Sequence, residues 1–392
     1  MIKNRNLVYK IREFMPENRW IHNKLADWKI QELKNEMISD YYITLGENDT
    51  SKISEIVQLF AKKRPKQISK LIKKFNIYLT RANLSYSPEE YQDNKTNMIF
   101  NYLAYGFAPD EFIFYRLNNR SLEEKKAYVT DIDRRIMQYQ MNDFKDLIYL
   151  TDKSGTYKKF RPFYYREEIS ISDKSDFDKF KQFANKHNHL VIKQVSASCG
   201  QGIQIEKTDH DHLQQQFKSI LKRGKCSIEE RIAQAEIMRQ FNESSINTVR
   251  VITFNTNHGL KIGPCFFRNG RKGSIVDNGG AGGIFITLDR YTGILDSDGW
   301  DEYLNCYVAH PDSGVHYRGF QLPAWDDCLH IVRKMCSLVP RLGYIGWDLA
   351  YTPQGWVLVE ANAAGQFVMP QICHNCGCKP EIEEYIADRI IW

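Results

Sequence analysis

The chain has 392 residues, of which 42% are hydrophobic and 26% are charged, and its formal net charge is +6. These values are ordinary for a globular protein of two or three domains with room for a core. No run of residues approaches the roughly 18 apolar positions of a membrane span, and the first residues lack the apolar core of a signal peptide. Nine scattered cysteines fit a reducing compartment, so we expect a cytoplasmic protein.

The positive charge is concentrated in the first quarter of the chain. Residues 1–100 contain 18 Lys and Arg against 12 Asp and Glu, whereas the remaining residues contain 36 of each. A basic face can meet an anionic polymer, a membrane surface or nucleic acid, but a solvated helical face is the more frequent explanation. We expect no nucleic-acid partner and leave open a peripheral position at the inner face of the membrane.

The chain up to about residue 145 has the pattern of a helical region. Apolar residues recur at helical spacing within 53–60 and 68–75, and Pro65 is expected to break the helix between them. A capping-box sequence at residues 121–124 predicts a helix that continues to about Gln140.

After about residue 150 the pattern changes to short strands separated by turns and helices. The expected strands are 189–194, 202–206, 249–255, 262–268 and 283–288. The expected helices are 175–187, 210–223 and, as the final one, 325–342. Such a mixture predicts an α+β or α/β region built from more than one lobe.

The most informative stretch is 346–367, in which two apolar segments flank a turn at 352–355. This pattern predicts a β-hairpin with Asp348 on its first arm. Glu360 and Asn362 lie two residues apart on the second arm and therefore share a face. Three oxygen ligands from one hairpin suit Mg²⁺. Whether Asp348 shares that face depends on the turn, and a merely solvated polar face is the alternative.

A second informative stretch is a strand that ends in Lys193 and is followed by a loop of small residues at 194–202. Such a loop can fold over phosphates with its backbone N–H groups, to which Lys193 adds a positive charge. The loop is neither a Walker A sequence nor a G-x-G-x-x-G motif, so neither a P-loop nor a dinucleotide fold is predicted.

Two arginines, Arg250 and Arg268, belong to segments that otherwise have the apolar pattern of strands. An unpaired guanidinium inside such a strand would be very costly, so each needs a carboxylate or phosphate partner. An internal salt bridge and a bound ligand are both open at this point. The loop at 278–283 is rich in glycine and can approach a ligand closely.

In chain order these pieces resemble the ATP-grasp superfamily over residues 150–375. The resemblance rests on a lysine-ended strand, a Gly-rich hairpin, an acidic hinge at 229–232, a strand with a basic residue, and the closing D…E-x-N set. The local sequence at 106–112, 247–251 and 345–348 is most similar to that of the sugar-transfer-associated ATP-grasp group, which is found with polysaccharide biosynthesis genes.

The resemblance implies an α+β ATP-grasp fold in which two α+β lobes sandwich ATP, preceded by a largely helical region. The implied division is a basic helical region at 1–145, a lobe with the Gly-rich hairpin at 146–235, and a lobe with the metal-binding hairpin at 236–392.

The same resemblance implies roles for individual residues. Lys193 would contact adenine and phosphate, and Lys153 would be an earlier phosphate-binding lysine. Arg250 and Arg268 would bind the γ-phosphate and the substrate carboxylate, and Asn278 would line the acceptor side. The implied Mg²⁺ ligands are Asp348, Glu360 and Asn362. The other implied nucleotide-binding residues are Ser198, Gly200 and Gly202 in the loop, Glu229, Glu230 and Ile232 at the adenine hinge, and Glu236 at the ribose.

The implied chemistry is ATP-dependent ligation. A carboxylate attacks the γ-phosphate of ATP to give an acyl phosphate, and an amine then displaces phosphate to form an amide. The implied substrates are a uronic-acid-type sugar and an amino acid or other amine, with glycan-assembly enzymes as partners. A peptide ligase and a non-catalytic nucleotide-binding scaffold are the alternatives.

Four possible soft metal ligands lie close together near the C-terminus, at Cys373, His374, Cys376 and Cys378. They could bind zinc, but no second ligand pair lies nearby in the sequence. Incidental thiols are the favoured interpretation.

Overall fold

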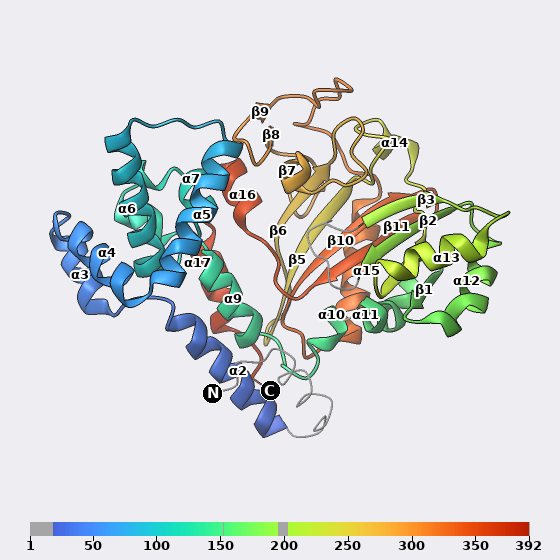
Figure 1. The fold of residues 1–392 in the computed structure, drawn as a ribbon, viewed down its shortest axis with the longest axis horizontal. Coiled ribbons are helices and arrows are strands. Elements are labelled where there is room, and N and C mark those ends of the chain that lie inside the picture. The colour runs from blue at the N-terminus through green and yellow to red at the C-terminus, as the bar shows by residue number, and fades with distance from the viewer. Residues whose placement is uncertain (1–18, 152, 195–202, 392) are drawn as a thin grey trace.

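The computed structural model describes residues 19–151, 153–194 and 203–391. Helices make up the N-terminal part, which lies to one side of the molecule in Figure 1. They are α2 (Arg19–Lys34), α3 (Asp40–Asn48), α4 (Lys52–Lys63), α5 (Pro65–Arg81), α6 (Pro88–Tyr105), α7 (Pro109–Phe114), α8 (Leu122–Lys126) and α9 (Asp131–Gln140), with the short turn η1 (Leu117–Asn119).

The helices α4 and α5 confirm the spacing predicted from the sequence, and Pro65 begins α5, where its missing N–H costs no hydrogen bond. The single helix expected from residue 121 to Gln140 is wrong. Ser121 caps only the short α8, and Thr130 caps a separate α9. Between them, the side-chain amide of Gln371 accepts a hydrogen bond from the Val129 N–H at 2.8 Å and donates one to the Val129 carbonyl at 3.0 Å.

A four-stranded antiparallel sheet follows, in the order β1-β4-β2-β3. Its strands are β1 (Glu168–Ile171), β2 (His189–Gln194), β3 (Ile203–Lys207) and β4 (Cys226–Glu230). The helical elements around it are α10 (Ile148–Thr151), α11 (Lys153–Phe160), η2 (Arg161–Phe163), η3 (Lys174–Asp176), α12 (Phe177–Ala184) and α13 (Leu213–Lys222). The phenylalanines of α12 and α13 pack against this sheet and form its core.

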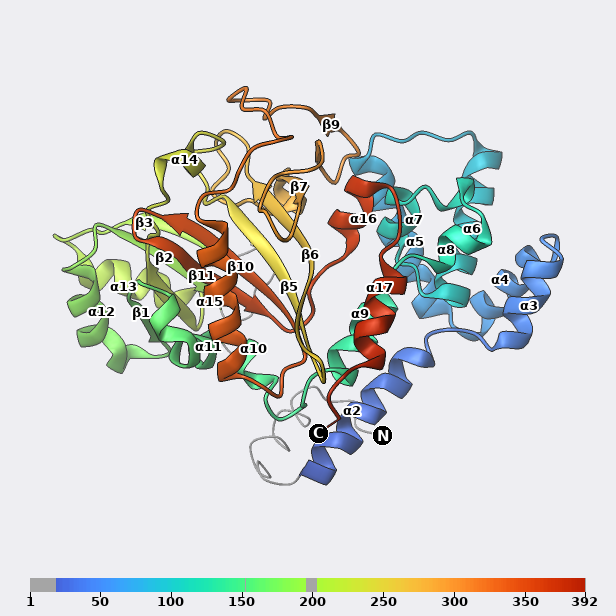
Figure 2. The same ribbon diagram turned by 180° about the vertical axis from the view of Figure 1, so that it is seen from behind.

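A larger antiparallel sheet has the order β11-β10-β5-β6-β7-β8-β9. Its strands are β5 (Thr248–Thr256), β6 (Gly259–Asn269), β7 (Ile284–Leu288), β8 (Gly299–Trp300), β9 (Cys306–Tyr307), β10 (Tyr344–Thr352) and β11 (Gly355–Asn362). The short elements α14 (Glu236–Arg239) and η4 (Gly279–Ala281) lie in its connections, and α15 (Trp325–Leu338) covers the face seen in Figure 2.

Two antiparallel sheets with attached helices confirm the predicted α+β class. The division at residues 145 and 235 stays a prediction. The helix expected over 325–342 ends at Leu338 and is not the final one, since α16 (Val368–His374) and α17 (Lys379–Ala387) follow. These two pack into the core of the N-terminal helices. Within the described part of the chain, no helix has the length and apolar content that crossing a bilayer requires.

Candidate active site

One face of the larger sheet carries a row of charged side chains. In the hairpin of β10 and β11, Asp348 lies directly opposite Glu360. On its other side, Asp348 lies directly opposite Arg250 of β5. Because directly opposed residues of antiparallel strands project from the same face, these three side chains form one row across three neighbouring strands. The hairpin predicted from the sequence is therefore confirmed, and its acidic residues share a face.

A β-bulge in β11 makes this row possible. From the turn as far as Leu358 the hairpin runs in simple register, but the next pair joins Asp348 to Glu360, so Val359 is an additional residue in β11. Without the bulge, Val359 would face Asp348, and Glu360 would lie opposite the fully buried Trp347 on the other face of the sheet. The bulge therefore decides where the Glu360 carboxylate points.

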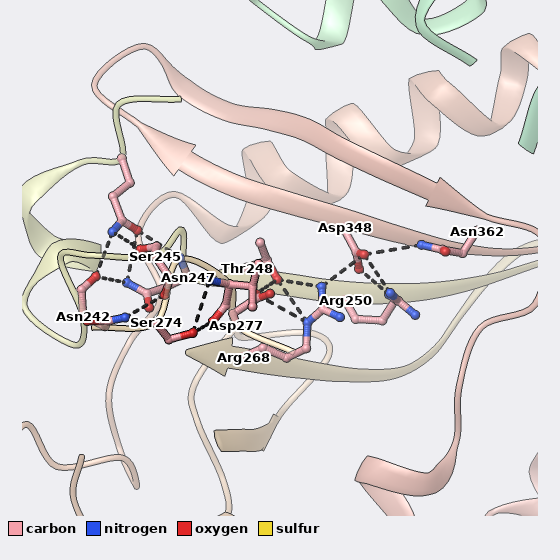
Figure 3. A network of polar contacts seen from close by, with 12 residues as sticks. Asn242, Ser245, Asn247, Thr248, Arg250, Arg268, Ser274, Asp277, Asp348 and Asn362 are labelled. Carbon is pink, nitrogen blue, oxygen red and sulfur yellow. Dashed lines mark hydrogen bonds and ion pairs between the residues drawn. The ribbon is translucent and has the colours of Figure 1, made fainter. Parts of the chain in front are cut away.

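The Asp348 carboxylate is buried and is held by two guanidinium groups (Figure 3). Arg250 forms a two-pronged ion pair with it, with Nη2 at 2.7 Å from Oδ2 and Nε bonded to Oδ1. Arg268 places Nη2 at 3.1 Å from Oδ2, and the amide of Asn362 donates to the same oxygen at 3.3 Å. Burial alone would raise the pKa of Asp348, but the two arginines lower it below its ordinary value. Each of the two arginines thus has a carboxylate partner, which is one of the two kinds of partner that its place in an apolar strand required.

The network continues from Arg268 into the segment before the glycine-rich loop. Arg268 donates from Nε and Nη2 to the hydroxyl of Thr248 at 3.1 and 2.8 Å, and it lies 3.6 Å from the carboxylate of Asp277. The Thr248 hydroxyl donates in turn to Asp277. Burial raises the pKa of Asp277 even though Arg268 opposes this effect. Sequence reasoning missed Asp277, whose position next to Asn278 of the glycine-rich loop was the available signal.

The smaller sheet contributes a second set of charges. Lys193 of β2 places its Nζ 2.6 Å from Oε1 of Glu229 in β4. Arg166 reaches the other oxygen of Glu229 at 2.8 Å. Burial would raise the pKa of Glu229, but Lys193 and Arg166 together lower it to about 2. Nothing in the sequence pattern had marked Arg166.

The two sets of charges lie close enough to shift one another's pKa values. Burial raises the pKa of Glu360 and Asp348 raises it further, whereas Lys193, Arg250 and Lys153 act in the opposite direction. Burial lowers the pKa of Lys153, and Glu360 opposes that shift. The Lys153 ammonium also donates to the carbonyl of Gln194 at 3.0 Å, at the end of β2. Lys193 of the smaller sheet and Lys153 of α11 thus lie near the Glu360 carboxylate of the larger sheet.

The roles of the remaining predicted residues stay predictions. Glu230 is half-buried and accepts a hydrogen bond from the Glu167 N–H at 3.2 Å. Ile232 is half-buried, and Glu236 is exposed at the first residue of α14. Asn278 precedes η4, and its carbonyl accepts from two N–H groups of the glycine-rich loop. The predicted loop positions Ser198, Gly200 and Gly202 lie outside the described residues.

The predicted magnesium ligands fit the metal in chemistry. Asp348, Glu360 and Asn362 offer hard oxygen atoms from the same hairpin, which is the ligand type that Mg²⁺ prefers. In this structure both oxygens of Asp348 accept hydrogen bonds from arginines. Arginine and a bound metal would therefore share the same carboxylate, whose two oxygens together offer about four lone pairs.

The cysteine-rich segment that spans the end of α16 forms no comparable site. Among residues 19–151, 153–194 and 203–391, no three His, Cys, Asp or Glu side chains gather closely enough to hold a metal ion. Cys376 is exposed, while burial raises the pKa of Cys373 and Cys378 to about 12, which leaves these two protonated.

The sequence and the fold of this chain can be compared with those of known protein families and solved structures. A family model described as sugar-transfer associated ATP-grasp matches residues 135–386. The chain belongs to this family. The resemblance seen in the sequence and the ATP-grasp fold it implied are thereby confirmed.

A comparison with curated proteins finds no match. Among solved structures, the chain is similar to N5-carboxyaminoimidazole synthetase from Staphylococcus aureus complexed with ADP, at 12% identity and a TM-score of 0.38, over 57% of this chain and 48% of that one. It is also similar to D-alanine–D-alanine ligase from Bacillus anthracis, at 12% identity and a TM-score of 0.40, over 65% of this chain and 74% of that one. A third similar structure is VanG D-Ala:D-Ser ligase from Enterococcus faecalis, at 14% identity and a TM-score of 0.42, over 66% of this chain and 68% of that one. The match thus spans about half the length of the synthetase.

Proposed function

We propose that this protein is an ATP-dependent carboxylate–amine ligase. One observation carries the proposal: Lys153 of α11 and Lys193 of β2 lie near Glu360, which shares a row with Asp348 and Arg250 in the larger sheet. Two lysines near a row that contains two carboxylates suit a phosphate chain bound together with a cation. Membership in the ATP-grasp family supports the same interpretation.

The proposed chemistry has two steps. A substrate carboxylate oxygen attacks the γ-phosphorus of ATP, ADP leaves, and an acyl phosphate forms. The nitrogen of an amine then attacks the carbonyl carbon and expels phosphate, which gives an amide. Arg250 and Arg268 orient the substrate carboxylate and the γ-phosphate, and Arg268 stabilises the oxyanion of the second step. Mg²⁺ held by Asp348, Glu360 and Asn362 would neutralise phosphate charge.

The substrates that we propose are a uronic-acid-type sugar carboxylate and an amino acid or other amine, within the assembly of a surface polysaccharide. Support comes from the family description, which associates these ATP-grasp proteins with sugar transfer. Glycan-assembly enzymes would be the natural partners of such a ligase.

An ADP-release screen tests this function. The protein, ATP and Mg²⁺ are combined with sugar acids, or with peptides, and with amino acids as amines. We expect ADP and phosphate only when a sugar acid and an amine are both present. Cleavage of ATP to AMP, or a γ-phosphate that stays on the product, would exclude the mechanism, and turnover with peptides alone would favour a peptide ligase. Lys193→Ala should abolish release, whereas Lys222→Ala, at an exposed position of α13, should not.

We also propose that the protein is cytoplasmic and meets the inner membrane face through a basic surface on α4 and α5. Residues 62–81 contain eight Lys and Arg and no Asp or Glu. The exposed members are Lys62, Lys63, Lys66, Lys70 and Lys73. A lysine close to an anionic leaflet contributes about 1 kcal/mol.

Sedimentation with lipid vesicles tests the membrane contact. We expect binding to vesicles with anionic lipid that weakens as salt is added, and no binding to neutral vesicles. The triple variant K66E/K70E/K73E should lose it, and K218E/K222E, on exposed positions of α13, should keep it. Equal loss in both variants would contradict a specific surface.

A further inference from the structure

Arg166 is a buried cation that the proposed chemistry leaves unused. It lies between η2 and β1, and only 2% of its side chain is exposed. Its Nε and Nη2 both lie 2.8 Å from Oε2 of Glu229 in the smaller sheet. Its Nη1 donates at 2.6 Å to the carbonyl of Leu358, and its Nη2 donates at 3.2 Å to that of Val359, both in β11 of the larger sheet. One guanidinium therefore links the two sheets.

The contacts with β11 fall on the bulge. Val359 is the additional residue of β11, and Leu358 is the last residue before it. A bulge leaves backbone groups outside the regular ladder, and the guanidinium satisfies two carbonyls at this point. Because the bulge turns Glu360 toward Asp348, a group that fixes the bulge also fixes the direction of the Glu360 carboxylate.

The contact with Glu229 lies in the smaller sheet, next to Lys193. The second oxygen of Glu229 holds the Lys193 ammonium at 2.6 Å. Arg166 therefore fixes the carboxylate that orients Lys193, and it does so from a position held over the Tyr164 ring at 4.4 Å. The neighbouring Tyr165 is exposed and has a φ of 47°, a left-handed conformation that residues with a side chain rarely adopt. A residue keeps such an unfavourable backbone conformation only where the contacts of its neighbours hold the chain in place, and Arg166 supplies such contacts here.

We propose that Arg166 is a positioning residue that couples Lys193 to Glu360, so that nucleotide binding and divalent-cation binding favour each other. This inference rests on the proposed function, because it assigns Lys193 to phosphate and Glu360 to the cation. The coupling needs the planar fork of arginine. A lysine could keep the ion pair with Glu229, but it cannot at the same time hold two carbonyls of β11.

The test compares wild type with Arg166→Lys in the full chain. The measured quantity is the factor by which Mg²⁺ tightens ADP binding, taken from calorimetric titrations with Mg²⁺ and with a chelator. We expect Arg166→Lys to reduce this factor at least about five-fold, the lower end of typical coupling between sites. Glu360→Gln should reduce it similarly, and adding Arg166→Lys to that variant should reduce it no further.

A matched control separates positioning from general stability. Arg290 is also partly buried, pairs with Glu381 at 3.1 Å and donates to the Ile262 carbonyl at 2.9 Å, and it lies outside the candidate site. Arg290→Lys should lower the melting temperature and leave the Mg²⁺ factor unchanged. An unchanged factor in Arg166→Lys, or an equal reduction in Arg290→Lys, would overturn the inference.

A second measurement needs no ligand. Hydrogen exchange of the segments 356–362 and 189–194 should accelerate in Arg166→Lys, while that of α4 and α5 should not. Uniform acceleration over the chain, or none at the bulge, would contradict a local positioning role. A wild-type protein that binds no ADP would refute the proposed function; local acceleration would then still show that Arg166 sets the geometry of the bulge.

Discussion

Removing the carboxylate of Asp348 should destabilise the folded protein as well as affect its chemistry. Asp348 is 3% exposed and Arg250 is 8% exposed, and their two-pronged ion pair is buried against one face of the sheet. Asp348→Ala leaves Arg250 buried without a carboxylate, whereas Arg268 keeps Asp277 at 3.6 Å. Breaking a buried pair by removing one partner costs about 3–5 kcal/mol. Because one arginine retains a partner, we expect a loss near the lower end, about 3 kcal/mol.

Urea unfolding followed by tryptophan fluorescence measures this loss, since the buried Trp347 is adjacent to the substituted residue. Asp211→Ala, at an exposed position, should change the free energy of unfolding by no more than about 0.5 kcal/mol. The double variant Arg250→Met/Asp348→Leu removes both charges and should recover most of the loss, because apolar replacements of buried pairs are often neutral. A double variant as unstable as Asp348→Ala would refute the reasoning.

Three further outcomes follow from single contacts. The pKa of Glu229 lies at about 2 in the folded protein, below its ordinary 4.5, so its contribution is present above about pH 4.5 and is lost toward about pH 2. The difference in unfolding free energy between wild type and Glu229→Gln should therefore close over that window, and a constant difference would contradict the assignment. Gly283→Ala would place a methyl group 2.1 Å from the carbonyl oxygen of Asp277, so we expect a loss of about 2 kcal/mol in unfolding free energy; Gly280→Ala, whose nearest neighbour is 4.0 Å away, should cost far less. Thr130→Ala should lower the unfolding free energy by about 1 kcal/mol, because it removes the cap of α9, and Thr130→Ser should retain stability. Thermal unfolding of the two variants measures the difference.

The sequence by itself determined the hairpin of β10 and β11 and the need for charge partners at two strand arginines. A turn between apolar segments fixes a hairpin locally, because few backbone conformations reverse the chain in so few residues. An arginine in an apolar strand requires a partner wherever the strand lies, because burying an unpaired guanidinium is too costly. The order of motifs was also sufficient to recognise the family, since it depends on residue types and not on their contacts.

Only the tertiary structure decided which carboxylates pair with these arginines. Asp348 meets Arg250 because β5 and β10 are neighbours in the sheet, although their sequences lie about a hundred residues apart. Asp277 meets Arg268 through a loop closure that no periodicity encodes. The break between α8 and α9 likewise coincides with a tertiary contact, since Gln371 bonds the backbone of Val129.

The facing of Asp348 and Glu360 shows the difference most clearly. Side chains alternate with a period of two along a strand, so one additional residue reverses the face of everything beyond it. The sequence shows no sign that Val359 is that residue, because a bulge depends on which backbone groups find partners elsewhere. Those partners come from Arg166, nearly two hundred positions earlier in the chain, and from the sheet that the strand joins.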